Sequence, residues 1–256
     1  MFTTNPFAEL SASISPAFMQ TYVVIMIILV VGGTLYDVLH KGSAKYFFDN
    51  WRDSRKKGTK QVGGGQMVSV AIQTAVVDVA TSGEFCNPQR RAAHLLTMYG
   101  FLAYVISTAV MVFGYATTTI WPFLWHIGAL MACIGGYWFW FFIRVDVAAE
   151  GHSPFRVMRA DLFVLSLLAS VTLALIWSAL QSSGAGGAKV FFGLYILATT
   201  FLFGSVPWSK FAHMFFKPAA ALQKRVSEAD GSRSNLPAPA DKPEIFSSVR
   251  REPRHY

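Results

Sequence analysis

Five long apolar stretches constrain this chain more than any other feature of its sequence. They cover residues 17–39, 92–114, 120–143, 162–180 and 189–208. Each has a length in the range of roughly 17–25 residues that an α-helix needs to cross about 30 Å of hydrocarbon. Only 14% of the residues are charged, whereas soluble domains contain about 25%. The sequence therefore predicts an all-α integral membrane bundle of five transmembrane helices.

The distribution of basic residues predicts how this bundle is oriented. Lys and Arg are concentrated between the first two stretches, between the third and fourth, and after the fifth, and only Lys189 lies on the opposite side. Basic loops stay in the cytoplasm, so we expect the N-terminus outside and the C-terminus in the cytoplasm. The net charge of +8 follows from this asymmetry. Because the basic residues adjoin membrane spans, they favour contact with anionic lipid and not with nucleic acid.

The remaining sequence predicts three parts of the chain. They are an outer N-terminal segment 1–16, a membrane domain 17–218 and a flexible cytoplasmic tail 219–256. The membrane domain contains a cytoplasmic linker, 41–87. Its charged and Gly-rich part, 41–66, is typical of a loop. The following residues, 67–80, favour a short interfacial or partner-facing helix.

Prolines predict several helix boundaries. Proline is favoured at the first position of a helix, so helices are expected to begin at Pro16, Pro88 and Pro154. The last span is expected to continue into the cytoplasm as a helix that Pro207 kinks. Pro218 disfavours helical conformation in the residue before it, which predicts the end of that extension.

Two histidines on different helices lie at the same predicted depth. His94 follows the expected start at Pro88 by nearly two turns, and His213 lies on the cytoplasmic extension of the fifth stretch. Two neutral imidazoles at one level suit the two axial positions of a haem iron, so His94 and His213 are the candidate metal ligands. The alternative interpretation is that each histidine near a helix end simply extends to the lipid headgroups.

A haem at this level would need an apolar slot and cations for its propionates. Gly100 lies deeper than His94 and would allow close approach of a porphyrin. Basic residues at the cytoplasmic level that suit the propionates are Arg90, Arg91, Arg156, Arg159 and Lys210. The two cysteines, Cys86 and Cys133, cannot supply the spacing of an iron–sulfur or zinc site. We therefore expect no cluster in this chain.

Two segments resemble a family of membrane anchors. They read DVATSGEFCNPQRRAAHLLTMYGF at 78–101 and VPWSKFAHMFFKPAAALQKR at 206–225. They are similar to the second and last helices of nitrate reductase gamma subunits and of heterodisulfide reductase-type haem b membrane anchors. Within this family, the overall likeness is to the anchors of sulfur-metabolism enzymes such as adenylylsulfate reductase.

The resemblance implies a function in electron transfer. It implies one haem b near the cytoplasmic side, held by His94 and His213, in a bacterial or archaeal cytoplasmic membrane. Electrons would pass between the quinone pool and a cytoplasmic redox enzyme with iron–sulfur or flavin centres, which would carry out the final chemistry. The alternative function is that of a cofactor-free membrane anchor or assembly factor for such an enzyme.

The chain departs from the family pattern at the deeper ligand positions. In the family, a second pair of histidines lies deeper on the same two helices, and the corresponding residues here are Tyr104 and Tyr195. Two phenolates facing one iron in an apolar environment would be costly. We expect a hydrogen-bonded pair of tyrosines in this place and no second haem.

Three further residues are candidates for contact with quinone. His126 lies in the outer half of the third stretch, where it suits a quinone contact or, with Met111 or Tyr195, a ligand of a second haem. The structural interpretation, which we favour, is a buried histidine bonded to a helix carbonyl. Asp37 and His40, at the inner end of the first stretch, suit a local pair or a quinone headgroup site, and ordinary interfacial solvation suits them equally well.

Overall fold

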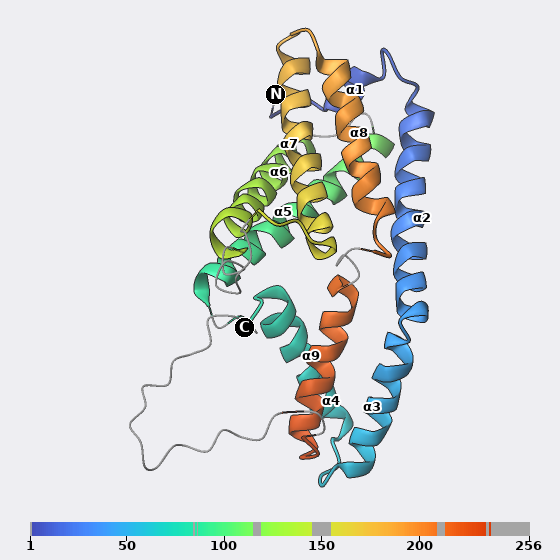
Figure 1. Cartoon of the computed structure of the whole chain (residues 1–256), viewed down its shortest axis with the longest axis vertical. Helices are drawn as coiled ribbons and strands as arrows, with labels where there is room; N and C mark the ends of the chain where they lie inside the picture. The colour runs from blue at the N-terminus through green and yellow to red at the C-terminus, as the bar shows by residue number, and fades with distance from the viewer. Residues whose placement is uncertain are drawn as a thin grey trace. The chain divides into compact units, whose positions relative to one another are not determined.

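The computed structural model describes residues 2–83, 85, 87–114, 119–144, 155–208, 213–233 and 236. All regular elements in these residues are helices, which confirms the predicted all-α class (Figure 1). The chain divides into two compact units. The first comprises Met1–Asp37 and Ala92–Ala212, and the second Val38–Arg91 and His213–Tyr256.

The first unit holds the long apolar helices. Its elements are α1 (Pro6–Leu10), most of α2 (Pro16–His40) and α5 (Pro88–Phe113), α6 (Ile120–Trp138), the π-helical η2 (Phe139–Ile143), the 3-10 turn η4 (Arg159–Asp161), α7 (Leu162–Ser182) and α8 (Ala188–Gly204). Four spans in the described residues are long and apolar enough to cross a bilayer: α2, α5, Ile120–Ile143 and α7. The chain thus has the helices of a multi-pass membrane protein.

The helix of the fifth predicted stretch is shorter than expected. α8 has 17 residues and ends at Gly204, and residues 205–208 form turns. Pro207 explains this end, because proline has no N–H to donate and disfavours helix in the residue before it. The prediction of a continuous helix kinked at Pro207 is therefore wrong, since the chain leaves the helix before it reaches the proline.

Apolar side chains cover the surface of α2. Only Met19, Met26 and Asp37 are buried on this helix, whereas residues such as Ile27 and Ile28 are more than half exposed. A large apolar surface of this kind is unfavourable in water and compatible with lipid. The Tyr22 hydroxyl bonds the Ile196 carbonyl at 3.1 Å and thereby ties α2 to α8.

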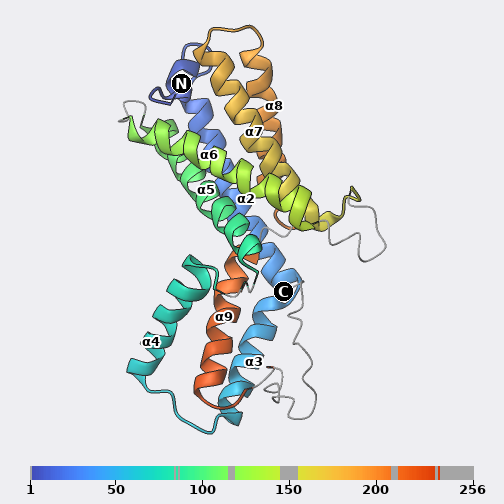
Figure 2. The same cartoon turned by 90° about the vertical axis from the view of Figure 1, so that its left-hand side faces the viewer.

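Helices α5 and α6 pack closely through small residues. Along α5 the buried residues Gly100, Tyr104, Ser107 and Met111 follow one another at steps of four, three and four residues, a spacing typical of a helix–helix seam. Gly128 and Gly135 lie opposite on α6: a Cβ on Gly135 would stand 2.6 Å from the Ala93 carbonyl oxygen and 2.8 Å from the Thr97 nitrogen. The two backbones are therefore in contact, as small residues permit in membrane helices. Figure 2 shows the two helices running alongside each other.

The N-terminal segment is folded against the bundle. Asn5 caps α1 by accepting a hydrogen bond from the Phe7 N–H at 3.0 Å, and its amide donates to the Met111 carbonyl at 3.1 Å. Phe7 is almost fully buried, with its ring centroid 5.3 Å from that of Trp177. Gln181 donates to the Pro6 carbonyl at 2.7 Å. Residues 5–10 therefore close the end of the bundle at which α5 ends and α6 begins.

The start of α7 differs from the prediction. The helix begins at Leu162, after η4, and residues 156–158 are not helical. The Asp161 carboxylate explains this boundary, because it accepts a hydrogen bond from the Met158 N–H at 2.8 Å and so satisfies a backbone donor ahead of the helix. The predicted start at Pro154, a residue outside the described part, is therefore wrong.

The second unit is built from amphipathic helices. Its elements are α3 (Ser43–Lys57), α4 (Gly64–Gln73), the π-helical η1 (Thr74–Ala80) and α9 (His213–Ala229). The loop prediction for 41–66 is wrong for α3, whose apolar positions Phe47 and Trp51 recur at helical spacing among many charged residues. The predicted helix over 67–80 is confirmed by α4 and η1. In Figure 2, α9 lies alongside α3 and α4.

Polar contacts tie α9 to the rest of the second unit. Arg225 binds the Asp78 carboxylate through two nitrogens, with Nη2 2.9 Å from Oδ1. These bonds raise the pKa of the Arg225 guanidinium above its ordinary value. The Ser54 and Ser227 hydroxyls, both buried, bond each other at 3.0 Å. Because of these contacts, α9 continues to Ala229 and the predicted flexible tail does not begin at 219.

Pro218 lies inside α9, so the predicted helix end before it is also wrong. Proline in a helix removes the one hydrogen bond that its own nitrogen would donate. Here that bond would go to the Met214 carbonyl in the first turn, where the helix has few bonds to lose. The contacts that α9 makes further along the chain maintain it beyond the proline.

Candidate functional site

His94 lies in the spanning helix α5. The Asn87 side chain caps α5 by accepting hydrogen bonds from the Gln89 N–H at 2.9 Å and the Arg90 N–H at 3.3 Å. The predicted helix start at Pro88 is confirmed. His94 is therefore the seventh residue of α5, and its side chain is half-buried. It belongs to the first unit.

His213 is the first residue of α9 and belongs to the second unit. Its side chain lies outside the described part of the structure, and so do residues 209–212, which include Lys210. The shared ligation of one iron by His94 and His213 therefore stays a prediction.

The four arginines expected near the propionates lie in different settings. Arg90 and Arg91 are half-buried in the first turn of α5, and Arg91 Nε donates to the Thr81 carbonyl at 2.7 Å. Arg156 and Arg159 are exposed and precede α7. Arg91 therefore has a backbone partner within its own unit, whereas Arg156 and Arg159 have exposed side chains.

Gly100 faces α6. A Cβ at this residue would stand 2.6 Å from the Ala132 nitrogen and 2.7 Å from the Gly128 carbonyl oxygen. The missing side chain therefore lets α5 approach α6. The prediction that Gly100 opens a slot for a porphyrin stays a prediction.

Tyr104 and Tyr195 fill the interior of the bundle. Both are at most 3% exposed. The Tyr195 ring stacks on Trp177 at 5.6 Å and 9°, and the Tyr104 ring lies 5.5 Å from Trp125. The Tyr104 hydroxyl lies near those of Tyr195 and Ser170 but completes no hydrogen bond of normal geometry within the described residues. Aromatic packing therefore fills this place, and the Tyr104 and Tyr195 hydroxyls lie close together.

His126 is held entirely by protein groups. The ring is fully buried, its Nδ1 lies 2.7 Å from the Pro122 carbonyl oxygen, and its Nε2 lies 2.8 Å from the Ser178 hydroxyl. The bond to Pro122 is the helix carbonyl contact of the structural interpretation. Both ring nitrogens are occupied, so a quinone or a haem iron could reach neither without breaking a buried hydrogen bond.

Asp37 and His40 lie near the end of α2 with contrasting exposure. Asp37 is 3% exposed, whereas His40, the last residue of the helix, is exposed. A carboxylate is rarely buried to this degree in a protein. Of the two, Asp37 is thus the residue whose environment departs from ordinary interfacial solvation.

A buried ion pair is the feature of the first unit that sequence reasoning missed. Arg144 Nε donates to Asp161 Oδ1 at 3.1 Å, and Nη2 bonds both Asp161 Oδ2 and the Arg156 carbonyl oxygen. The Arg144 guanidinium also lies 3.9 Å from the Trp140 ring centroid. Arg144 could be predicted only as one more cytoplasmic cation. The sequence signal that could have indicated a partner for Arg144 is the single acidic residue, Asp161, at the start of the fourth apolar stretch.

Comparisons of this chain with protein-family models, with curated proteins and with solved structures give no match.

Proposed function

We propose that this protein is a membrane-anchoring haem b subunit that exchanges electrons between the quinone pool and a cytoplasmic oxidoreductase. In this proposal α8 is a fifth, short span, the N-terminus is outside, and the C-terminus is in the cytoplasm of a bacterium or archaeon. The partner would be an enzyme of sulfur metabolism such as adenylylsulfate reductase. The resemblance of 78–101 and 206–225 to haem b anchors motivates this assignment.

The position of His94 is the observation that carries the proposal. It is a half-buried imidazole nearly two turns inside a spanning helix. In the proposal His213 would supply the second ligand, since neutral imidazole is a common axial ligand of haem iron. A haem bound there supplies one-electron redox chemistry; the chain supplies its ligands and an apolar environment.

The interior of the first unit supports a single haem. Tyr104 and Tyr195 occupy the places where the family has its second pair of ligands, and both rings are packed against tryptophans. His126 has both nitrogens engaged by protein groups. Quinone would therefore react near the inner end of the helices, where Asp37 and His40 are the candidate contacts.

Visible spectroscopy of the purified chain tests the proposal. Dithionite-reduced minus oxidised spectra of the natural protein are expected to show the α and Soret bands of haem b. His94→Gly and His213→Gly should each remove these bands, because each removes one axial ligand. Added imidazole should partly restore them, since it can occupy the vacated position.

A matched histidine variant provides the control. His40→Ala changes an exposed histidine at the end of α2 and should leave the bands unchanged. Bands that persist unaltered in both glycine variants would refute ligation by this pair. A natural protein without any b-type bands would favour the cofactor-free anchor or assembly factor.

A further inference from the structure

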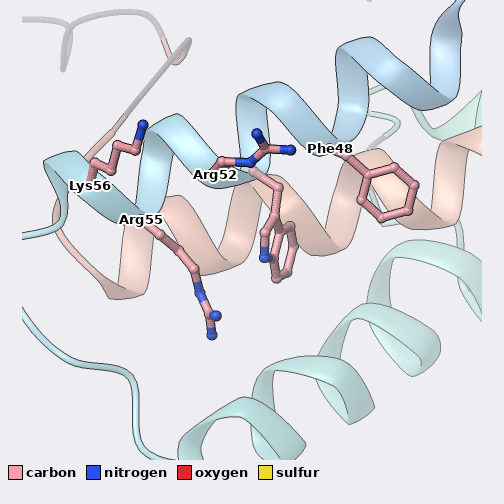
Figure 3. Close-up of a pocket in the computed structure, with 5 residues that line it drawn as sticks. Phe48, Arg52, Arg55 and Lys56 are labelled. Carbon is pink, nitrogen blue, oxygen red and sulfur yellow. The ribbon is translucent and has the colours of Figure 1, made fainter.

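One face of α3 combines aromatic and basic side chains. Phe48, Trp51, Arg52, Arg55 and Lys56 line an open groove of about 500 Å³. At 3.6 residues per turn these five positions cover less than half of the helix circumference, and both acidic residues of α3 lie outside that arc. Figure 3 shows Arg52 and Lys56 together on one edge of the groove and Arg55 on the other.

The cations of this groove are available to an outside anion. α3 contains five basic and two acidic residues. Its two ion pairs are long and exposed: Arg52 to Asp49 at 3.7 Å and Lys56 to Asp53 at 3.8 Å. Exposed pairs of this kind contribute little free energy, so a phosphate can compete for Arg52 and Lys56. Arg55 lies 6.0 Å from the Trp51 ring centroid, and aromatic stacking leaves a guanidinium able to bind anions.

The exposed aromatic residues favour a lipid over a free anion as the ligand of this groove. Tyr46 and Phe48 are 67% and 61% exposed, although neither ring gains anything from water or from a small anion. At a membrane interface, in contrast, aromatic rings lie at the level of the headgroups, and basic side chains beside them reach the lipid phosphates. The aromatic and basic side chains of α3 therefore fit a membrane interface, which is apolar on one side and anionic on the other.

The connection between α2 and α3 is short. α2 ends at His40 and α3 begins at Ser43, so the link spans at most about 10 Å. Gly42 adopts a left-handed conformation with φ of 64°, which glycine accommodates readily. Since α2 is long and apolar enough to span a bilayer, the first turn of α3 lies within reach of the headgroup layer.

We propose that α3 is an interfacial helix whose groove binds the phosphate of an anionic phospholipid. Arg52, Arg55 and Lys56 would contact the headgroup, and Phe48 would enter the interface. This site depends on the membrane location of the chain and not on its haem.

Lipid titration of the full-length protein in a neutral detergent tests this site. Phosphatidylglycerol is expected to raise the thermal unfolding midpoint, whereas phosphatidylcholine and inorganic phosphate should not. In the triple variant Arg52→Gln, Arg55→Gln, Lys56→Gln, the mole fraction of phosphatidylglycerol needed for half of the shift should rise at least tenfold, because each cation near an anionic surface contributes to binding. Phe48→Ser should weaken the response without changing the midpoint in detergent alone.

A second triple variant controls for charge. Lys57→Gln, Lys60→Gln, Lys224→Gln removes three exposed cations of the same unit and should respond to phosphatidylglycerol like the natural protein. Equal responses of the two triple variants would overturn the proposal, and so would inorganic phosphate that reproduces the lipid effect. The proposal would also be overturned if the groove triple variant lost binding to a soluble acidic protein while its response to lipid stayed unchanged. That result would favour a protein docking surface. Haem spectra of both variants should match the natural protein, which separates this result from the redox proposal.

Discussion

Asp161→Ala is expected to destabilise the protein by about 3–5 kcal/mol, because it leaves a buried guanidinium without its counterion. The Arg144 side chain is 6% exposed and that of Asp161 14%, so water cannot replace the lost partner. Asp161 also accepts the Met158 N–H ahead of α7. The thermal unfolding midpoint in mild detergent, followed by circular dichroism, should fall by about 6–20 °C.

The double variant makes this prediction specific to the pair. Arg144→Leu, Asp161→Leu removes both charges, and replacing a buried ion pair by apolar residues is often nearly neutral. The double variant should therefore be more stable than either single variant. Asp53→Ala serves as the control, because Asp53 is 60% exposed in its pair with Lys56 and should change the midpoint little. If the stability lost in the double variant equalled the sum of the losses in the two single variants, the two side chains would not act as a pair.

Gly135→Leu is expected to prevent normal packing of α5 against α6. The first added carbon would already stand 2.6 Å from a carbonyl oxygen of α5, and the contact lies between backbones, which cannot rotate away as side chains can. Overpacking typically costs about 1–3 kcal/mol, and a forced separation of two helices should reach or exceed the upper limit. Size-exclusion chromatography in detergent should show aggregated protein or a strongly reduced yield.

Gly193→Leu is the matched control for this substitution. Gly193 also lies in an apolar helix, but a Cβ there has no neighbour within 4 Å. The variant should elute and melt like the natural protein. If Gly135→Leu behaved in the same way, α5 and α6 could not be in the contact described for Ala93, Thr97 and Gly135.

Periodicity and capping residues predicted much of the fold. Asn87 and Pro88 marked the start of α5 correctly, because a side-chain cap and a proline at the first helical position are local signals. The errors arose where distant contacts decide the outcome. Pro218 suggested a helix end, yet Arg225 binds Asp78 and keeps α9 intact beyond it. The high charge of 41–66 suggested a loop, yet α3 packs through a few residues at helical spacing.

The candidate site shows the same division between local and distant signals. The structural interpretation of His126 agrees with its bond to the Pro122 carbonyl, which lies one turn away on the same helix. The contact of Gly100 with α6 could not be predicted, because nothing in the sequence shows which neighbour a small residue faces. The bond between Arg144 and Asp161 joins residues 17 positions apart in the sequence, and no spacing rule predicts such a pair.

Haem content and ligation of the purified natural protein test the central claim most directly. We predict one haem b per chain by the pyridine haemochrome method, with a low-spin electron paramagnetic resonance signal of bis-imidazole type in the oxidised protein. Two haems per chain, a high-spin signal, or protein that folds and inserts into membranes without haem would contradict it.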